Sequence, residues 1–132
     1  MTTLRVIEMD HIVLNVSDVE RSFRFYTGVL GLQGERWEEF SSGKVGFPSV
    51  RINADTLIDL MRSPSAESPS SANLSHFCLV AERLDLADLV ESFRARGVTI
   101  VTEPVSRWGA HGQATSIYIL DPDGNEIEIR CY

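Results

Sequence analysis

The chain repeats one pattern of strands, helix and polar residues, and this repeat restricts its possible folds more than any other feature. The segments DHIVLNV and SHFCLVA both read as strands with a histidine at the second position, His11 and His76. A helix pattern and then short strands follow each of them. Each half closes on an acid between two apolar residues, Asp59 and Glu128. The histidines are 65 positions apart and the acids 69, so the sequence indicates two copies of one supersecondary unit.

Each half is predicted to contain one helix and four strands. Ser17 and Glu20 have the spacing of a capping box, so we expect Ser17 to cap a helix that ends at Gly31. Apolar residues at helical spacing between positions 86 and 93 predict a second helix, which ends at Gly97. The predicted strands are residues 9–16, 35–41, 44–53, 56–62, 75–81, 98–102, 114–120 and 125–131.

A segment without periodicity separates the two halves. Residues 63–74 are rich in serine and contain two prolines, which predicts an exposed linker. A chain of 132 residues has the size of one domain, so we expect a single domain over residues 1–132. It comprises module one (8–62), the linker (63–74) and module two (75–132). The fold class is α+β: two βαβββ modules that form a curved, partly closed mixed sheet with the helices outside.

Alternation along the strands predicts that the histidines and acids face away from the core. In the segment EIEIR, the isoleucines share one face and the charged residues, with Glu128 among them, share the other. Asp59 and His11 alternate with apolar neighbours in the same way. A single such residue is usually just the hydrated face of a sheet. The match between the halves favours a metal site instead, since two imidazoles and two carboxylates can bind a divalent ion.

Composition and charge exclude several classes of function. The apolar fraction of 43% and charged fraction of 23% are those of a globular protein, and no apolar run approaches the roughly 20 residues that span a bilayer. A net charge of −7 without a basic cluster argues against binding to nucleic acid or anionic membranes. Cys78 and Cys131 are expected to be free thiols in a reducing cytoplasm, since no export signal is present.

These residues resemble the vicinal oxygen chelate superfamily, which includes glyoxalase I, extradiol dioxygenases and bleomycin-binding proteins. The most specific segments are DHIVL, FYTGVLGL and DPDGNEIE, and the resemblance covers nearly the whole chain. It implies metal ligands at His11, His76 and Glu128. The family's last ligand is the acid four residues after the turn glycine, here Gly124, which selects Glu128 over Glu126.

A second segment resembles one branch of this family. RWGAHG, followed by Ser116 and Tyr118, is similar to a glyoxalase-like branch sometimes labelled virulence-associated, which has no settled substrate. Asn15, Trp108, His111 and Tyr118 are the candidate substrate-binding residues.

Asp59 departs from the family pattern, because glyoxalase I has glutamate at this position. Aspartate is shorter by roughly 1.5 Å, whereas metal–oxygen distances tolerate only about ±0.2 Å. Asp59 is therefore a direct ligand on a closer strand, a ligand through water, or a general base. With Asp59 and Glu128 as the catalytic acids, Zn²⁺, Ni²⁺, Co²⁺ or Mn²⁺ would stabilise the enediolate formed when a carbon-bound proton is removed.

Two other functions remain open. Without Asp59, the two histidines and Glu128 form the facial triad of non-haem Fe(II) dioxygenases, with His111 or Tyr118 as acid–base partner. A non-catalytic drug- or metabolite-binding protein, similar to bleomycin-resistance proteins, would need aromatic walls. The candidates for such walls are Trp37, Phe40, Phe47 and Trp108. In every case we expect a small-molecule ligand and a homodimer, with the site either within one chain or across the dimer.

Overall fold

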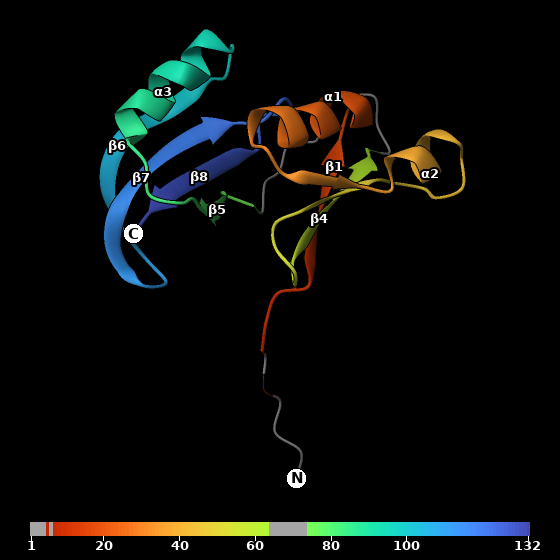
Figure 1. Ribbon diagram of the computed structural model, residues 1–132, viewed down its shortest axis with the longest axis horizontal. Helices are drawn as coiled ribbons and strands as arrows, with labels where there is room; N and C mark the ends of the chain where they lie inside the picture. The colour runs from red at the N-terminus through yellow and green to blue at the C-terminus, as the bar shows by residue number, and fades with distance from the viewer. Residues whose placement is uncertain (1–4, 6, 64–73) are drawn as a thin grey trace. The chain divides into compact units, whose positions relative to one another are not determined.

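The chain divides into two compact units, residues 1–69 and 70–132. The computed structural model describes residues 5, 7–63 and 74–132. Module one lies in the first unit and module two in the second, and Figure 1 shows the helix and sheet of each. Most of the predicted linker, residues 64–73, lies outside the described residues.

Module one is a four-stranded mixed sheet with helical segments. In chain order it contains β1 (His11–Val16), α1 (Val19–Arg24), a π-helical turn (Phe25–Val29), β2 (Gln33–Glu35), α2 (Trp37–Ser41), β3 (Ser49–Arg51) and β4 (Leu57–Arg62). The strand order is β1-β4-β3-β2. β1 and β4 are parallel, and the other neighbours are antiparallel.

Module two has the same topology. It contains β5 (Phe77–Val80), α3 (Leu86–Ala95), β6 (Ile100–Gly109), β7 (Gly112–Leu120) and β8 (Glu126–Cys131). The order is β5-β8-β7-β6, and again the first pair is parallel and the others antiparallel. Two mixed four-stranded sheets with few helices confirm the α+β class and the internal repeat.

One face of each sheet forms a core with the module's helix. In module one, α1 packs on β4, and Val16, Tyr26 and Leu60 are fully buried. In module two, α3 contacts β6 and β7 and buries Val90 and Phe93 with four isoleucines of β7 and β8. Burying each such side chain stabilises the fold by roughly 1.5–3 kcal/mol. Because strand side chains alternate, the opposite face of each sheet is left for polar residues.

Several predicted boundaries were wrong. The cap of α1 is Asp18, whose side chain accepts the backbone N–H of Arg21, and Ser17 instead accepts a bond from the Arg21 guanidinium. The predicted strand over 35–41 is mostly α2, and the one over 44–53 shortens to β3. The predicted strand over 98–102 overlaps the beginning of β6, which starts at Ile100 and runs to residue 109.

The turn before β8 is built as the sequence predicts. The Asp121 carboxylate accepts the backbone N–H groups of Asp123 and Asn125, and the Gly124 N–H donates to the Asp121 carbonyl. Gly124 has φ +83°, a conformation that favours glycine. This tight turn sets the register of β8 and therefore the face on which Glu128 lies.

Candidate metal centre

Module one brings one histidine and one acid together on the face opposite its helix. His11 on β1 is opposite Leu57 on β4, and Asp59 lies two residues further along β4, on the same face. The His11 Nε2 atom is 3.9 Å from the Asp59 Oδ2 atom. The Asp59 side chain is largely buried, whereas the imidazole is about half exposed. The face is therefore open to a ligand at the imidazole.

The other nitrogen of His11 is held by the preceding residue. His11 Nδ1 is 2.6 Å from the Asp10 carboxylate. This hydrogen bond raises the pKa of His11 above its ordinary value, and the negative charges of Asp59 and Asp10 add to the effect. A carboxylate that binds one imidazole nitrogen fixes the ring and makes the other nitrogen a better metal ligand.

The second oxygen of Asp59 is also occupied. The buried hydroxyl of Ser49, directly opposite on β3, donates to Asp59 Oδ1 at 2.6 Å. Arg36 donates to the same hydroxyl oxygen at 3.2 Å, and its guanidinium lies over the Phe47 ring. Arg36 has φ +63°, which is uncommon for a residue other than glycine. Only Oδ2 of the carboxylate faces His11.

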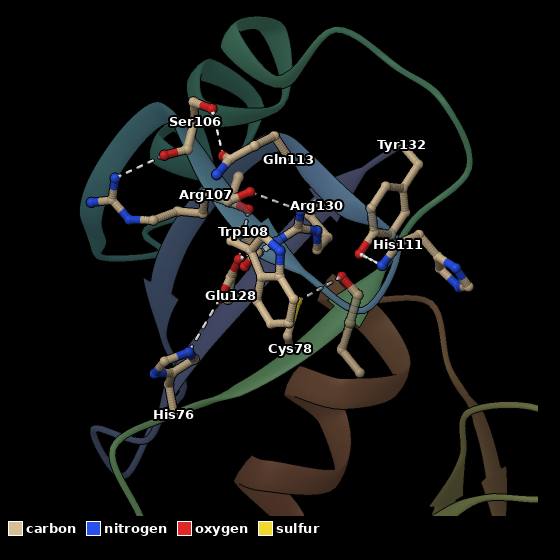
Figure 2. Close-up of polar contacts among 12 residues, drawn as sticks. His76, Cys78, Ser106, Arg107, Trp108, His111, Gln113, Glu128, Arg130 and Tyr132 are labelled. Carbon is tan, nitrogen blue, oxygen red and sulfur yellow. Dashed lines mark hydrogen bonds and ion pairs between the residues drawn. The ribbon is translucent and has the colours of Figure 1, made fainter.

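Module two repeats this arrangement at closer distance. The His76 Nε2 atom is 3.2 Å from the Glu128 Oε1 atom (Figure 2). His76 Nδ1 is 3.1 Å from the hydroxyl of Ser75. The buried hydroxyl of Ser116 on β7 donates to Glu128 Oε2 at 2.6 Å. The Tyr118 ring meets the His76 ring edge to face at 5.4 Å.

A buried arginine distinguishes module two from module one. Arg130 donates to Glu128 Oε2 at 3.1 Å and also to the backbone carbonyls of Arg107, Trp108 and Gly112 (Figure 2). Its side chain is 3% exposed. The corresponding residue of β4, two positions after the acid, is Met61.

The charge state of Glu128 follows from these contacts. Burial alone would raise the pKa of Glu128, but hydrogen bonds from Ser116 and Tyr118 and the electrostatic effect of Arg130 and His76 outweigh it, so the pKa is lowered. Glu128 is therefore ionised at neutral pH, as a metal ligand must be. Cys78 lies opposite Glu128 on β5, and burial together with the Glu128 charge raises the pKa of its thiol to about 11.

The distances test whether each pair fits one metal ion. Two donor atoms about 2.1 Å from an ion are about 3.0 Å apart at a right angle and about 3.4 Å apart at the tetrahedral angle. The 3.2 Å pair of His76 and Glu128 lies within this range. The 3.9 Å pair of His11 and Asp59 exceeds it by about 0.5 Å. In neither described module do three or more such side chains cluster, so each module contributes a pair.

The candidate substrate-binding residues fall into two groups. Asn15 lies on the same face of β1 as His11, and Tyr118 contacts His76. His111 instead lies in the β6–β7 turn, where its backbone N–H donates to the Tyr132 hydroxyl and its ring packs on the Tyr132 ring. Trp108 is 76% exposed on β6. Figure 2 shows His111 beside Tyr132 and His76 beside Glu128, on opposite sides of the view.

The proposed aromatic walls of module one pack mostly on their own neighbours. Trp37 stacks on Phe23 with ring centres 4.6 Å apart and also contacts Phe40. Phe47 lies beneath the Arg36 guanidinium. These contacts indicate ordinary packing for these three rings.

Sequence reasoning did not assign the residues that support the pairs. Ser49, Arg130, Asp10 and Ser75 carried no predicted role, and Ser116 entered only as part of a family segment. One signal was present in the alternation: Ser49 and Ser116 fall on the polar faces of their strands and are nevertheless buried.

Comparison with known proteins identifies the family. A model of the Glyoxalase/Bleomycin resistance protein/Dioxygenase superfamily matches residues 8–129. The chain belongs to this superfamily. The residues quoted above for the vicinal oxygen chelate resemblance lie within the matched range, so that resemblance is confirmed.

Relatives within the superfamily carry different names. Virulence protein STM3117 of Salmonella typhimurium is 37% identical over 125 residues, covering 94% of this chain and 83% of that protein. A lactoylglutathione lyase of the same organism is 30% identical over 123 residues, covering 90% of this chain and 88% of the lyase. The solved structure of an integron cassette protein from V. cholerae matches with a TM-score of 0.76 and 31% identity, covering 99% of each chain. The chain is thus similar to virulence-labelled members of the superfamily as well as to lyases.

Proposed function

We propose that the protein is a metal-dependent, glyoxalase-like lyase or isomerase that acts on a small molecule with two neighbouring oxygens. The observation that carries this proposal is the repeated pair of a histidine Nε2 atom and one carboxylate oxygen, present once in each module. Similarity to a lactoylglutathione lyase supports the same class of chemistry.

The residues have distinct roles in this proposal. His11, His76 and Glu128 hold the divalent ion, whose Lewis acidity polarises the two substrate oxygens. Glu128 suits a permanent ligand because Arg130 and Ser116 hold it as an anion. Asp59 suits a proton acceptor or a ligand through water, because Ser49 binds one of its oxygens and the other lies farther from His11 Nε2 than two donors at a right or tetrahedral angle on one ion.

Because each module supplies two donor side chains, a full set of metal ligands requires two modules. These are the two modules of one chain or modules from the two chains of a homodimer. We propose a cytoplasmic homodimer, and sedimentation at micromolar concentration tests the assembly. A monomer with full metal occupancy would contradict the dimer and place the site within one chain.

No helix in the described part of the chain is long and apolar enough to cross a membrane.

The wide spacing of His11 and Asp59 favours a second candidate, an Fe(II) dioxygenase with a triad of two histidines and Glu128. Tyr118 is the better acid–base partner, since it contacts His76 whereas His111 packs on Tyr132. A third candidate, a binding protein without catalysis, needs no metal.

Metal analysis and two assays separate these functions. The protein is purified, stripped, reloaded with Zn²⁺, Ni²⁺, Co²⁺, Mn²⁺ or Fe²⁺ and analysed for bound metal. Each form is then assayed with a glutathione hemithioacetal and, for iron, with a catechol. Isomerisation supports the main proposal, and ring cleavage by the iron form supports the dioxygenase. No metal retained under any condition would refute both enzymes.

A further inference from the structure

A buried serine hydroxyl touches the acid of each module, and neither serine has an assigned role. Ser49 donates to Asp59 Oδ1 and Ser116 donates to Glu128 Oε2, both at 2.6 Å. Ser49 is 1% exposed and Ser116 is fully buried. A hydroxyl bound to a carboxylate at this distance makes a short, charge-assisted hydrogen bond. The same contact therefore occurs twice, in two units of the fold that form it independently.

We propose that Ser49 and Ser116 are positioning residues that occupy one oxygen of each acid, so that each acid presents a single oxygen on the side of its histidine. The inference rests on the proposed metal-dependent function and adds that both acids act through one oxygen. In module one the presented atom is Asp59 Oδ2, and in module two it is Glu128 Oε1. A carboxylate that chelated the ion through both oxygens would have to give up its serine.

The strand register matches each serine to the length of its acid. Ser49 is directly opposite Asp59 on the neighbouring strand. The residue opposite Glu128 is Tyr118, and Ser116 lies diagonally, opposite Arg130. Glutamate is longer by one methylene group, so its carboxylate can reach a serine one position further along the same strand face. The different offset thus gives the same contact with two acids of different length.

Each serine–acid contact also has an arginine beside it. In module one the arginine is Arg36, which donates to the Ser49 oxygen. That bond turns the Ser49 proton toward Asp59, since the hydroxyl oxygen then accepts from Arg36 and donates to the acid. In module two Arg130 donates directly to the oxygen of Glu128 that Ser116 binds. In both modules the serine and the arginine act at the oxygen of the acid that does not face the histidine.

The test is Co²⁺ binding to the metal-free protein, measured by calorimetric titration and by the visible absorption of the bound ion. The variants are Ser49→Ala and Ser116→Ala, and the control is Ser22→Ala, which removes an equally buried hydroxyl from α1. Loss of a group that supports a metal ligand typically weakens binding about 10–100-fold. We expect this loss in Ser116→Ala, because Glu128 is a proposed ligand. In Ser49→Ala, whose acid acts through water or as a proton acceptor, we expect a smaller loss of affinity and an altered Co²⁺ spectrum. The control should change by less than about threefold and keep its spectrum.

Further variants separate positioning from simple folding. Ser49→Thr and Ser116→Thr keep the hydroxyl and should recover most of the Co²⁺ affinity. If an alanine variant fails to fold by circular dichroism, Ser→Cys at the same position keeps the volume but donates weakly, and it should also weaken binding. A cobalt–thiolate absorption band in that variant would show that the position faces the metal rather than the acid, which would overturn the proposal.

The outcomes distinguish this inference from the proposed function. If the wild type binds Co²⁺ and both alanine variants keep its affinity and spectrum, the role of the serines is overturned and the metal-dependent function is unaffected. Absence of Co²⁺ binding by the wild type would overturn both. Equal weakening in Ser22→Ala would show a general effect of lost buried hydroxyls and would also overturn the role.

Discussion

Replacing Arg130 by methionine tests the electrostatics of module two most directly, because Met61 shows that β4 carries methionine at the equivalent position. Arg130 is almost fully buried and binds Glu128 and three backbone carbonyls. Removing one partner of a buried ion pair costs about 3–5 kcal/mol, since the remaining charge stays buried without compensation. For a chain of this size the melting temperature should fall by about 10–20 °C.

Urea unfolding followed by circular dichroism measures this change, with Arg94→Met as a control. Arg94 also pairs with two acids, Glu91 and Glu103, but its side chain is 46% exposed. The control should therefore lose less than about 1 kcal/mol. Adding Glu128→Gln to Arg130→Met removes the uncompensated charge and should recover part of the loss, which a double-mutant cycle quantifies.

The pH dependence gives this prediction a second test. The pKa of Glu128 is lowered in the folded protein, so its contribution to stability is present above its ordinary value of 4.5 and is lost as the pH falls through the folded pKa. Without Arg130, the lowering effect of its charge on the pKa of Glu128 is lost, so burial raises that pKa. The stability difference between wild type and Arg130→Met should then shrink as the pH falls below 4.5. The reasoning would be refuted if Arg130→Met lost no more stability than Arg94→Met. A stability difference between wild type and Arg130→Met that did not change with pH would also refute it.

Three further predictions concern the proposed metal site. Glu128→Gln should reduce metal content sharply while Glu126→Gln leaves it nearly unchanged, as metal analysis would show; the reverse result would mean that the wrong acid has been chosen. Asp59→Ala should lower turnover much more than Co²⁺ affinity, and equal losses in both would make Asp59 a direct ligand. Protons compete with metal for His11, and the Asp10 bond raises the pKa of His11, so Asp10→Asn should move the pH midpoint of Co²⁺ binding downward even though the affinity at high pH falls. Titrations at a series of pH values check this, and an unchanged midpoint would contradict it.

The fold could be predicted from the sequence where periodicity was strong. Alternation in β4 and β8 correctly placed Asp59 and Glu128 opposite the core, and the turn glycine Gly124 set the register of β8. The five residues of α2 were missed because one and a half helical turns give no distinct periodicity, and aromatic residues such as Trp37 and Phe40 also favour strands.

The supporting residues of the site could not be read from sequence for a different reason. Ser49 and Ser116 act across strands, at offsets set by pairing register, and register is a tertiary property. Arg130 looked like a solvated charge at the end of an alternating strand, yet it is buried because backbone carbonyls of the β6–β7 hairpin accept its protons. Local pattern shows which face a side chain occupies but not what will cover it.

The placement of the two tryptophans gives the protein a natural pair of optical reporters. Trp37, stacked on Phe23, belongs to module one, and Trp108, three-quarters exposed, belongs to module two. A Trp37→Phe protein would emit from module two alone, with a red-shifted spectrum that acrylamide quenches readily. A Trp108→Phe protein would report module one from a more shielded indole. Fluorescence can therefore follow each half of the chain separately, without an added label, as metal or denaturant is titrated.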